Sequence, residues 1–449
     1  MTQLNFADIH YFSVLNQNIL LDVNSGSVHL IDECTMSALD ALKMAEGDFE
    51  RAAKLLNTEE NEALVQLKEL VKEGLLFTPD ETGGFYQPPA TTVKSLCLNI
   101  SHDCNLACGY CFAAEGSFGG QRLNMPLETA KKAIDYLLAN TKRTFCEVDF
   151  FGGEPLLNIS VVQATVEYAR AKAADVGKTI KFTLTTNAVG LTPKIEKWLD
   201  EAAVSVILSH DGRQKIHDTM RYFPNGRGSY DVVSANIGRY VVNHPDGDFY
   251  IRGTYTNKNL DFVADVEHWL QKGWRRLSME PVVEKEAAYR IKEEDLPKIK
   301  DSYNKLARLY DAKRKEGQPF EFFHFNIDLQ HGPCLLKRLT GCGAGHEYLV
   351  VTPEGDLYPC HQFVGREAWR LGNLATGIER PHLVEELKTA HVYNKPVCKK
   401  CWARFYCSGG CQANAQLFNN NLLEPYEIGC KISRLRLEYA IWVAVVPLA

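Results

Sequence analysis

The sequence predicts an α/β protein, built around an open, partial barrel of six strand–helix units, (βα)6. A small domain precedes the barrel and a cysteine-rich extension follows it. Three observations predict this organisation. Strand-like and helix-like segments alternate from residue 95 to about residue 285. Residues 1–77 have the pattern of a small antiparallel sheet followed by three helices, and eight of the fourteen cysteines lie between Cys334 and Cys430.

The composition is that of an ordinary globular protein and excludes several classes. The 449 residues suggest roughly three domains, and 45% hydrophobic with 24% charged residues excludes a disordered or fibrous chain. A net charge of −6 argues against nucleic-acid coating. No apolar run is long enough to span a membrane, and residues 1–5 show no export signal. We expect a cytoplasmic protein without membrane or nucleic-acid partners, in which so many cysteines serve metal or redox chemistry.

The first domain, residues 1–77, is expected to be winged-helix-like. DNA binding is the usual function of that shape, but residues 1–90 hold 5 basic and 15 acidic side chains, which would repel a phosphate backbone. We therefore predict a peptide-binding module that adds a guest strand to an exposed sheet edge. The expected strands are Ile9–Val14, Ile19–Val23 and Val28–Ile31, and the expected helices are Thr35–Lys43, Asp48–Leu56 and Glu59–Glu73.

A linker over residues 78–92, rich in glycine and proline, leads into the predicted barrel of residues 93–317. A doubly wound parallel sheet would give a similar rhythm, so that alternative stays open. The expected strands are Ser95–Ile100, Glu147–Phe151, Ile180–Thr185, Val204–Leu208, Phe249–Thr254 and Arg276–Met279. The expected helices are Leu127–Asn140, Val161–Ala174, Pro193–Glu201, Asp261–Gln271 and Glu293–Lys315.

Three cysteines follow the first barrel strand directly: Cys104, Cys108 and Cys111. Three thiolates on one loop can hold three irons of a [4Fe–4S] cube and leave the fourth iron without a protein ligand. An open metal position is a place for chemistry. Zinc is the alternative, with His102 as a possible fourth ligand.

Short polar motifs follow the next strands. Gly152-Gly153-Glu154 ends the second strand, Thr186-Asn187 the third and Ser209 the fourth, with Arg221 shortly after. Glycines permit close backbone approach, and the carboxylate can accept hydrogen bonds from an ammonium group. Because barrel enzymes place their sites at the carboxyl ends of the strands, we expect these motifs at one rim.

Together these motifs resemble those of radical S-adenosylmethionine (SAM) enzymes. Cys104, Cys108 and Cys111 match the CxxxCxΦC signature, with Tyr110 at the Φ position. The resemblance implies that SAM binds the open iron and is cleaved to a 5′-deoxyadenosyl radical that abstracts a substrate hydrogen. The residues it implies as SAM contacts are Tyr110, Gly152, Gly153, Glu154, Thr186, Asn187, Ser209 and Arg221.

The extension, residues 318–449, ends in a dense group of cysteines, for which a pair of zinc knuckles is the general alternative. It resembles the SPASM extension of radical SAM enzymes, which implies two auxiliary [4Fe–4S] clusters and three clusters in all. By the resemblance, the distal cluster is held by Cys398, Cys401, Cys407 and Cys430. The cluster nearer the active site is held by Cys342, Cys360 and Cys411. Its fourth ligand is either Cys334 or a substrate thiolate, and we favour the open site.

Among radical SAM enzymes, the chain most resembles maturases of the SCIFF class (six cysteines in forty-five residues), which form Cys thioether (sactionine) crosslinks in ribosomally made peptides. This implies a Cys-rich precursor peptide, its leader bound by the N-terminal domain, and a small electron donor such as flavodoxin or ferredoxin. Formylglycine maturation, carbon–carbon crosslinking and a zinc-bound scaffolding or regulatory protein are the alternatives. Glu280, at the end of the sixth strand, is either a local base or a salt-bridged rim carboxylate.

Overall fold

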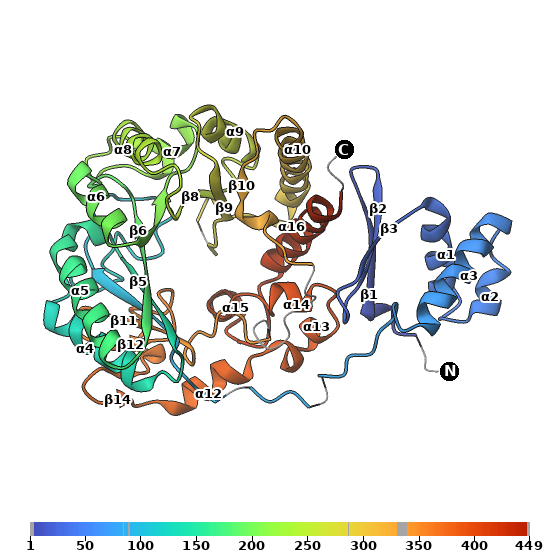
Figure 1. Cartoon of the computed structure of the whole chain (residues 1–449), viewed down its shortest axis with the longest axis horizontal. Coiled ribbons are helices and arrows are strands. Elements are labelled where there is room, and N and C mark those ends of the chain that lie inside the picture. Colours follow the sequence, from blue (N-terminus) through green and yellow to red (C-terminus); the bar gives the residue numbers. More distant parts are fainter. Residues whose placement is uncertain (1–3, 84, 89, 286, 330–338, 447–449) are drawn as a thin grey trace.

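The architecture of the chain was determined from a computed structural model, which describes residues 4–83, 85–88, 90–285, 287–329 and 339–446. The chain forms a curled sheet ringed by helices, a cysteine-rich region facing the open side of that ring, and a separate N-terminal lobe (Figure 1). The fold is α/β with a partial barrel, as the sequence predicts. No helix among the described residues combines the length and apolar character needed to cross a bilayer.

The N-terminal lobe contains an antiparallel sheet, of strand order β1-β2-β3, and three helices. The side chains of Asp32, Asp48 and Asn57 cap the three helices by accepting hydrogen bonds from backbone N–H groups. Ile9 and Leu20 pack on the helices, whereas Phe12 and Leu21 belong to the core shared with the rest of the chain. The elements are β1 (Ile9–Val14), β2 (Gln17–Asp22), β3 (Val28–Ile31), α1 (Glu33–Met44), α2 (Phe49–Ala53) and α3 (Thr58–Lys72).

The barrel strands are parallel and follow one another in the unbroken order β9-β8-β7-β6-β5-β4. A doubly wound sheet reverses its order at a switch point, so that alternative is wrong. The strands are β4 (Ser95–Ser101), β5 (Phe145–Gly152), β6 (Thr179–Thr186), β7 (Val204–Ser209), β8 (Phe249–Tyr255) and β9 (Arg276–Pro281). The helices are α4 (Leu127–Asn140), α5 (Ile159–Asp175), α6 (Pro193–Glu201), α7 (Gln214–Met220), α8 (Tyr230–Asn243), α9 (Val263–Gln271) and α10 (Leu296–Lys315).

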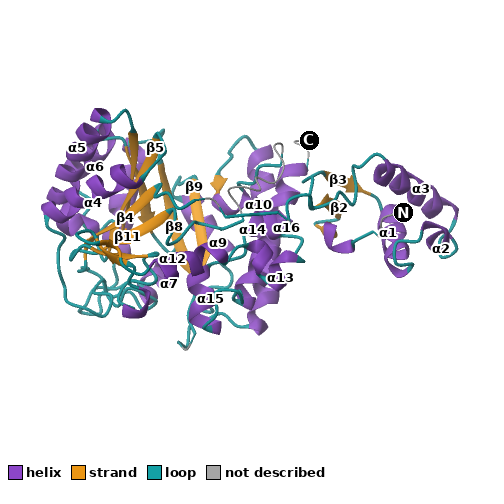
Figure 2. Ribbon diagram, turned by 90° about the horizontal axis from the view of Figure 1, so that it is seen from below, coloured by secondary structure: helices purple, strands orange, loops and turns teal. Residues whose placement is uncertain are grey.

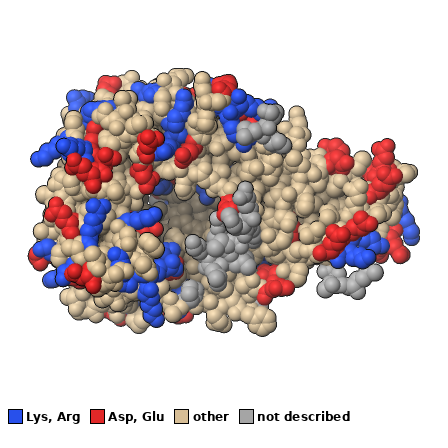
Figure 3. Space-filling view, viewed as in Figure 1, with Lys and Arg blue, Asp and Glu red and all other residues tan. Residues whose placement is uncertain are grey.

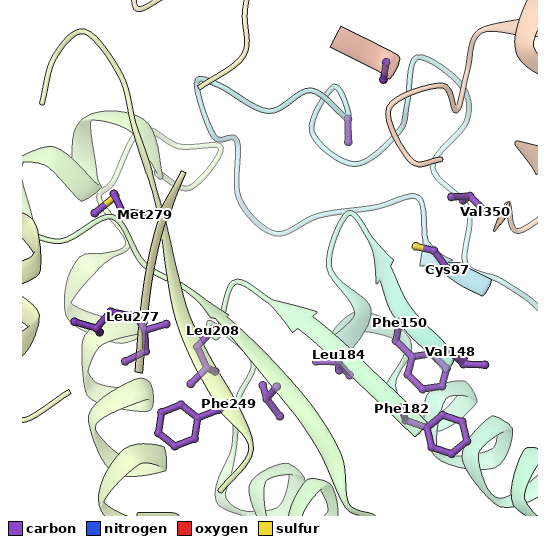
Figure 4. Close-up of a cluster of buried hydrophobic side chains, with 14 of the residues drawn as sticks. Cys97, Val148, Phe150, Phe182, Leu184, Leu208, Phe249, Leu277, Met279 and Val350 are labelled. Carbon is purple, nitrogen blue, oxygen red and sulfur yellow. The ribbon is translucent and has the colours of Figure 1, made fainter. Parts of the chain in front are cut away.

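The main core lies between these strands and the surrounding helices. Alternate residues of each strand point to this layer, so Val148 and Phe150 of β5 lie beside Phe182 and Leu184 of β6 (Figure 4). The rings of Phe150 and Phe182 stack at a centroid distance of 6.0 Å. Burying each such side chain contributes about 1.5–3 kcal/mol, and the opposite face of the strands is left free to line the barrel lumen.

The C-terminal region is joined to the same sheet. Strand β11 (Tyr348–Val351) pairs in parallel with β4, and three short antiparallel strands follow it. Helix α16 (Glu427–Val445) packs on α10, where the rings of Tyr303 and Tyr439 stack at 6.0 Å. The remaining elements are β10 (Glu321–Phe322), β12 (Asp356–Tyr358), β13 (Gly372–Asn373), β14 (Gly377–Ile378), α12 (Pro381–Thr389), α13 (Pro396–Lys399), α14 (Arg404–Cys407) and α15 (Gln412–Asn419).

The N-terminal lobe is docked on the C-terminal region, at the end of the molecule away from the barrel (Figure 2). The ring of His10 in β1 stacks on Trp402 at a centroid distance of 3.9 Å. The Nε2 atom of the same histidine lies 3.0 Å from a carboxylate oxygen of Glu438 in α16. The hydroxyl of Tyr393 donates to Asp80 in the linker. These contacts place the acidic lobe next to the cysteine-rich region.

Candidate functional site

The three-cysteine loop follows β4 and lies against the segment after α7. The backbone N–H groups of Ala107 and Gly109 donate to the carbonyls of Tyr222 and Met220, at 2.8 and 2.7 Å. The pKa of Cys104 is raised to about 12, mainly by burial, with smaller contributions from Glu154 and from the neighbouring thiols Cys108 and Cys111. Burial likewise raises the pKa of Cys108 to about 11. The loop therefore brings three thiols close enough for their charges to interact.

The end of β5 packs directly on this loop because its last residue and the next one are glycines, Gly152 and Gly153. A Cβ atom at Gly152 would lie 2.3 Å from the carbonyl oxygen of Ser101, and one at Gly153 would lie 2.2 Å from that of Asp103. The N–H groups of Gly153 and Glu154 donate to these same two carbonyls, at 2.7 and 2.9 Å. A side chain at either position would push the two strand ends apart, so the glycines fix the distance between the cysteine loop and Glu154.

Glu154 is a buried carboxylate whose hydrogen-bond donors among the described residues are all neutral groups. It is 1% exposed and accepts hydrogen bonds from the hydroxyl of Thr186 and the backbone N–H of Asn187, both at 2.7 Å. Burial raises its pKa, which the hydrogen bonds and the more distant Arg221 oppose. No lysine, arginine or histidine of the described chain lies within ion-pair distance of it. A ligand ammonium would supply the missing positive charge.

Arg221 joins the cysteine loop to the rim of β7. Its Nη1 atom donates to the hydroxyl of Tyr110 at 2.9 Å, and that hydroxyl donates to Asp211 at 2.5 Å. The Nε atom of Arg221 is buried and has no hydrogen-bond partner within the described residues. The spare donor leaves Arg221 able to bind a ligand carboxylate. Ser209, the last residue of β7, lies on the same rim, two positions before Asp211.

The histidines of this region shape loops. His210 is completely buried, and its ring nitrogens face Ser234 at 2.8 Å and the indole N–H of Trp269 at 2.9 Å. His102, the possible zinc ligand of the sequence analysis, has its Nε2 atom 3.3 Å from the side-chain amide of Asn99. Burial lowers the pKa of both rings.

The cysteines of the C-terminal region lie in two groups. The four cysteines predicted to hold the distal cluster, Cys398, Cys401, Cys407 and Cys430 (the distal group), line one small cavity. The three predicted for the nearer cluster are Cys342, Cys360 and Cys411 (the proximal group), and their thiols act on one another electrostatically. Cys334 lies outside the described residues.

Thiol charge is coupled within each group. The pKa values of Cys398 and Cys360 are raised to about 12, mainly by burial, and the other thiols of the respective group are among the smaller causes. Within the described part of the chain, no three His, Cys, Asp or Glu side chains converge as ligands of a single metal ion do.

A cavity of about 380 Å³ separates the barrel rim from the cysteine-rich region. Its wall includes Arg252 of β8, Glu280 of β9, Cys407 and Cys411, and Arg436 of α16. The hollow is visible between barrel and C-terminal region in Figure 3. One cavity is thus bordered by barrel residues on one side and by predicted cluster cysteines on the other.

Glu280 is held by basic side chains in the cavity wall. One of its carboxylate oxygens lies 3.0 Å from Nε2 of His324, and the other lies 3.8 Å from Arg436. Burial acts to raise the pKa of Glu280, but His324, Arg252 and Arg436 outweigh it and hold that pKa well below its usual range. The contacts correspond to the salt-bridged alternative of the sequence analysis. They also keep the carboxylate ionised.

Sequence reasoning missed two basic residues of this cavity, Arg252 and Arg436. Arg252 is the exposed position of a strand whose neighbouring residues are buried or partly buried. A charged residue inside an otherwise uncharged strand, Phe249–Tyr255, is the sequence signal that could have found it, because such a side chain must face the lumen or solvent. Arg436 lies in helix α16, and the sequence around it gives no signal that its side chain lines a cavity.

Comparisons with known proteins agree with this geometry. Residues 95–231 match a family model described as a 4Fe-4S single cluster domain, and residues 342–402 match the SPASM iron-sulfur cluster-binding domain. The radical SAM cyclopropyl synthase TigE of Paramaledivibacter caminithermalis is 30% identical over 370 residues, covering 78% of this chain and 74% of its own. A cysteine-type anaerobic sulfatase-maturating enzyme of Clostridium perfringens is 27% identical, over 76% of this chain and 94% of its own.

Among solved structures, Streptococcus suis SuiB bound to precursor peptide SuiA superimposes with a TM-score of 0.53. The match covers 94% of this chain and 98% of SuiB, at 17% sequence identity. At that identity the likeness establishes the fold, which extends over nearly the whole chain.

Proposed function

The chain belongs to the radical SAM family, and from that premise we propose that it is a peptide maturase that installs Cys thioether crosslinks in a ribosomally made, Cys-rich precursor peptide. Together with its SPASM domain, membership means that the enzyme uses SAM and [4Fe–4S] clusters. The proposal concerns the substrate, the bond that is formed and the role of each residue.

The residues present fit these cofactors. Three thiols on one loop suit a [4Fe–4S] cluster with one open iron, and the distal group surrounds its own small cavity. The unpaired carboxylate of Glu154 suits the SAM ammonium, and the orphaned Nε of Arg221 suits a carboxylate. Cys104, Cys108 and Cys111 would hold the SAM-site cluster, and the distal and proximal groups would hold the two auxiliary clusters.

When bound, SAM and the cluster held by the three-cysteine loop would supply radical hydrogen-abstraction chemistry, and the auxiliary clusters would supply an acceptor for the surplus electron. The chain's own residues position the reactants. Thr186 and Asn187 orient Glu154, and Gly152 and Gly153 set its distance from the cysteine loop. Tyr110 and Asp211 hold Arg221 at the rim.

The observation that carries the proposal is the shared cavity. A peptide segment in this space faces the barrel rim, where hydrogen abstraction occurs in this family, and the thiol of Cys411 at the same time. We propose that the abstraction is from the backbone Cα of an acceptor residue, and that a substrate cysteine sulfur bonds to that carbon. Glu280 is the proposed acceptor of the thiol proton. His324, Arg252 and Arg436 lower its pKa and so keep it ionised in the cavity wall, in the form that can accept a proton.

The N-terminal domain is proposed to bind the leader of the precursor peptide. Strand β3 is an edge strand of its sheet and presents Leu30, which is 46% exposed. An extended peptide can pair with such an edge, and SuiB, whose fold matches nearly the whole chain, was solved with a precursor peptide. The acidic composition of this domain favours a leader that carries basic residues. A flavodoxin or ferredoxin is the proposed electron donor.

Formylglycine maturation is the second candidate, because a sulfatase-maturating enzyme aligns over most of both chains. Both reactions need the same radical, and they differ in what happens to the substrate cysteines. A thioether consumes the thiol of one cysteine and leaves no new carbonyl group. Formylglycine introduces an aldehyde.

Mass spectrometry separates these reactions. Holoenzyme reconstituted without oxygen is incubated with SAM, dithionite and a Cys-rich peptide encoded beside its gene, and the product is then alkylated with iodoacetamide. We expect the loss of two hydrogen atoms per crosslink and one cysteine that resists alkylation for each. A product that reacts with a hydrazide probe and keeps its other cysteines alkylable would replace thioether formation with formylglycine maturation. A colourless, fully folded protein that binds zinc and yields no 5′-deoxyadenosine would contradict both candidate functions.

A further inference from the structure

Lys395 is buried beside both auxiliary cysteine groups. It directly precedes α13, and only 1% of its surface is exposed, which makes it the one buried lysine among the described residues. Its ammonium donates one hydrogen bond, of 2.8 Å, to the carbonyl oxygen of Gly409. No carboxylate in the described part of the chain forms an ion pair with it. A buried cation without an anionic partner costs several kcal/mol, so negative charge must come from elsewhere.

The thiols surrounding Lys395 can supply that charge. Gly409 lies between Cys407 of the distal group and Cys411 of the proximal group. A Cβ atom at Gly409 would lie 3.5 Å from the Lys395 Nζ, so the backbone of this turn is in direct contact with the ammonium. Burial lowers the pKa of Lys395, and the charges of Cys398, Cys407, Cys411 and Cys430 oppose that effect. The ammonium therefore interacts with cysteines of both groups.

We propose that Lys395 is the electrostatic partner of the auxiliary clusters and raises their reduction potential. A reduced cluster carries one more negative charge than an oxidised one, so a cation fixed nearby stabilises the reduced form more. The auxiliary clusters consequently accept an electron more readily than they would beside a neutral side chain. This inference rests on the part of the proposed function that assigns clusters to these cysteines, and it is independent of the peptide and of the bond formed.

The test is an EPR-monitored redox titration of the reconstituted full-length protein. Replacing Cys104, Cys108 and Cys111 by alanine in every sample leaves only the auxiliary clusters to observe. Lys395→Met removes the charge at similar size, and Lys395→Arg keeps it. Lys399→Met is the matched control, because Lys399 lies in α13, the short helix that follows Lys395, and is next to Cys398 but exposed.

We expect Lys395→Met to lower the midpoint potential of at least one auxiliary cluster, with a redox equilibrium shifted by about tenfold, or 59 mV for one electron. Lys395→Arg and Lys399→Met should titrate as the parent protein does. If Lys395→Met loses iron while Lys395→Arg keeps it, the charge requirement is also supported. Unchanged potentials in Lys395→Met overturn the proposal, and so does equal loss of iron from the Met and Arg variants. A failure to crosslink any peptide, by contrast, leaves these potentials unaffected and counts only against the proposed function.

Discussion

The guanidinium of Arg404 donates a hydrogen bond of 3.0 Å to the carboxylate of Asp8, and thereby ties the distal cysteine loop to the N-terminal domain. Arg404 lies between Cys401 and Cys407, and its side chain is 2% exposed. It also donates to the carbonyl oxygen of Ala7 at 3.2 Å. The proposed leader-binding domain is therefore anchored on residues adjacent to predicted cluster ligands.

Asp8→Ala should loosen this anchor, because it leaves a buried guanidinium without its anionic partner. We expect a loss of about 3 kcal/mol in the stability of the docked arrangement and faster proteolytic cleavage in the linker over residues 78–92. Limited proteolysis of the holoenzyme measures this. Glu367→Ala is the control, since Glu367 pairs with Arg380 at 2.9 Å but is 73% exposed, and such pairs contribute about 0–1 kcal/mol. Equal cleavage of both variants would contradict the anchoring role.

Gly153→Ala should disrupt the SAM site. The new Cβ would collide with the carbonyl of Asp103, so Glu154 and the cysteine loop must separate. Displacement of this kind lowers rates on the order of 100-fold, measured as 5′-deoxyadenosine formed per cluster. Gly238→Ala is the control, because nothing lies within 4 Å of the corresponding Cβ. Parental SAM cleavage by Gly153→Ala would show that the close approach is unnecessary.

Leu30→Asp should weaken leader binding while leaving SAM cleavage without peptide unchanged. It puts a charge on the apolar edge of β3, within an already acidic domain, and we expect roughly tenfold weaker binding, about 1.4 kcal/mol. Fluorescence anisotropy with a labelled leader peptide measures the affinity. The control is Val242→Asp, on α8 of the barrel, where Val242 is 78% exposed. An unaltered affinity of Leu30→Asp for the leader peptide would show that the leader binds somewhere other than β3.

Asp149→Asn should stabilise the protein at neutral and higher pH. Burial, with a smaller contribution from Glu147, raises the pKa of Asp149 from 3.8 to about 6. Between these values the folded state holds a proton that the unfolded state has lost, so the stability cost of Asp149 grows as pH rises from about 4 to about 6 and is fully present above that. We expect Asp149→Asn to gain about 1–3 kcal/mol at pH 8, a gain that shrinks toward pH 5.

Thermal unfolding of the holoenzyme across this range checks the prediction. The exposed Glu167→Gln, on α5, serves as control and should show no such pH dependence. A difference between Asp149→Asn and the parent that is the same at pH 5 and pH 8 would rule out titration of Asp149 as its cause.

The sequence predicted the barrel well because its strands and helices have strong local patterns. All six strands lie where the alternation indicated, and α4 and α6 have the predicted bounds. The rim motifs were also predictable, since each follows a strand directly. Tyr110 and Arg221 were predicted as SAM contacts, but the hydrogen bonds that join them to each other and to Asp211 depend on the closure of the sheet, which no local pattern reports.

The burial of Lys395 was not predictable for a related reason. It precedes two exposed lysines, Lys399 and Lys400, in a segment that looks uniformly polar. Its environment is created when the chain returns at Gly409 to cover it. Likewise, Glu280 meets His324 and Arg436 only because the sixth strand, the segment after α10 and the last helix converge.

The pairing of β11 with β4 makes the cysteine-rich region a continuation of the barrel sheet rather than an appendage. Moving the cysteine-rich region away from the barrel would require breaking that ladder of backbone hydrogen bonds. The pairing therefore fixes how the barrel and the cysteine-rich region lie on either side of the cavity between them. A peptide that occupies this cavity, as proposed, has to fit a space whose size is set by backbone hydrogen bonds.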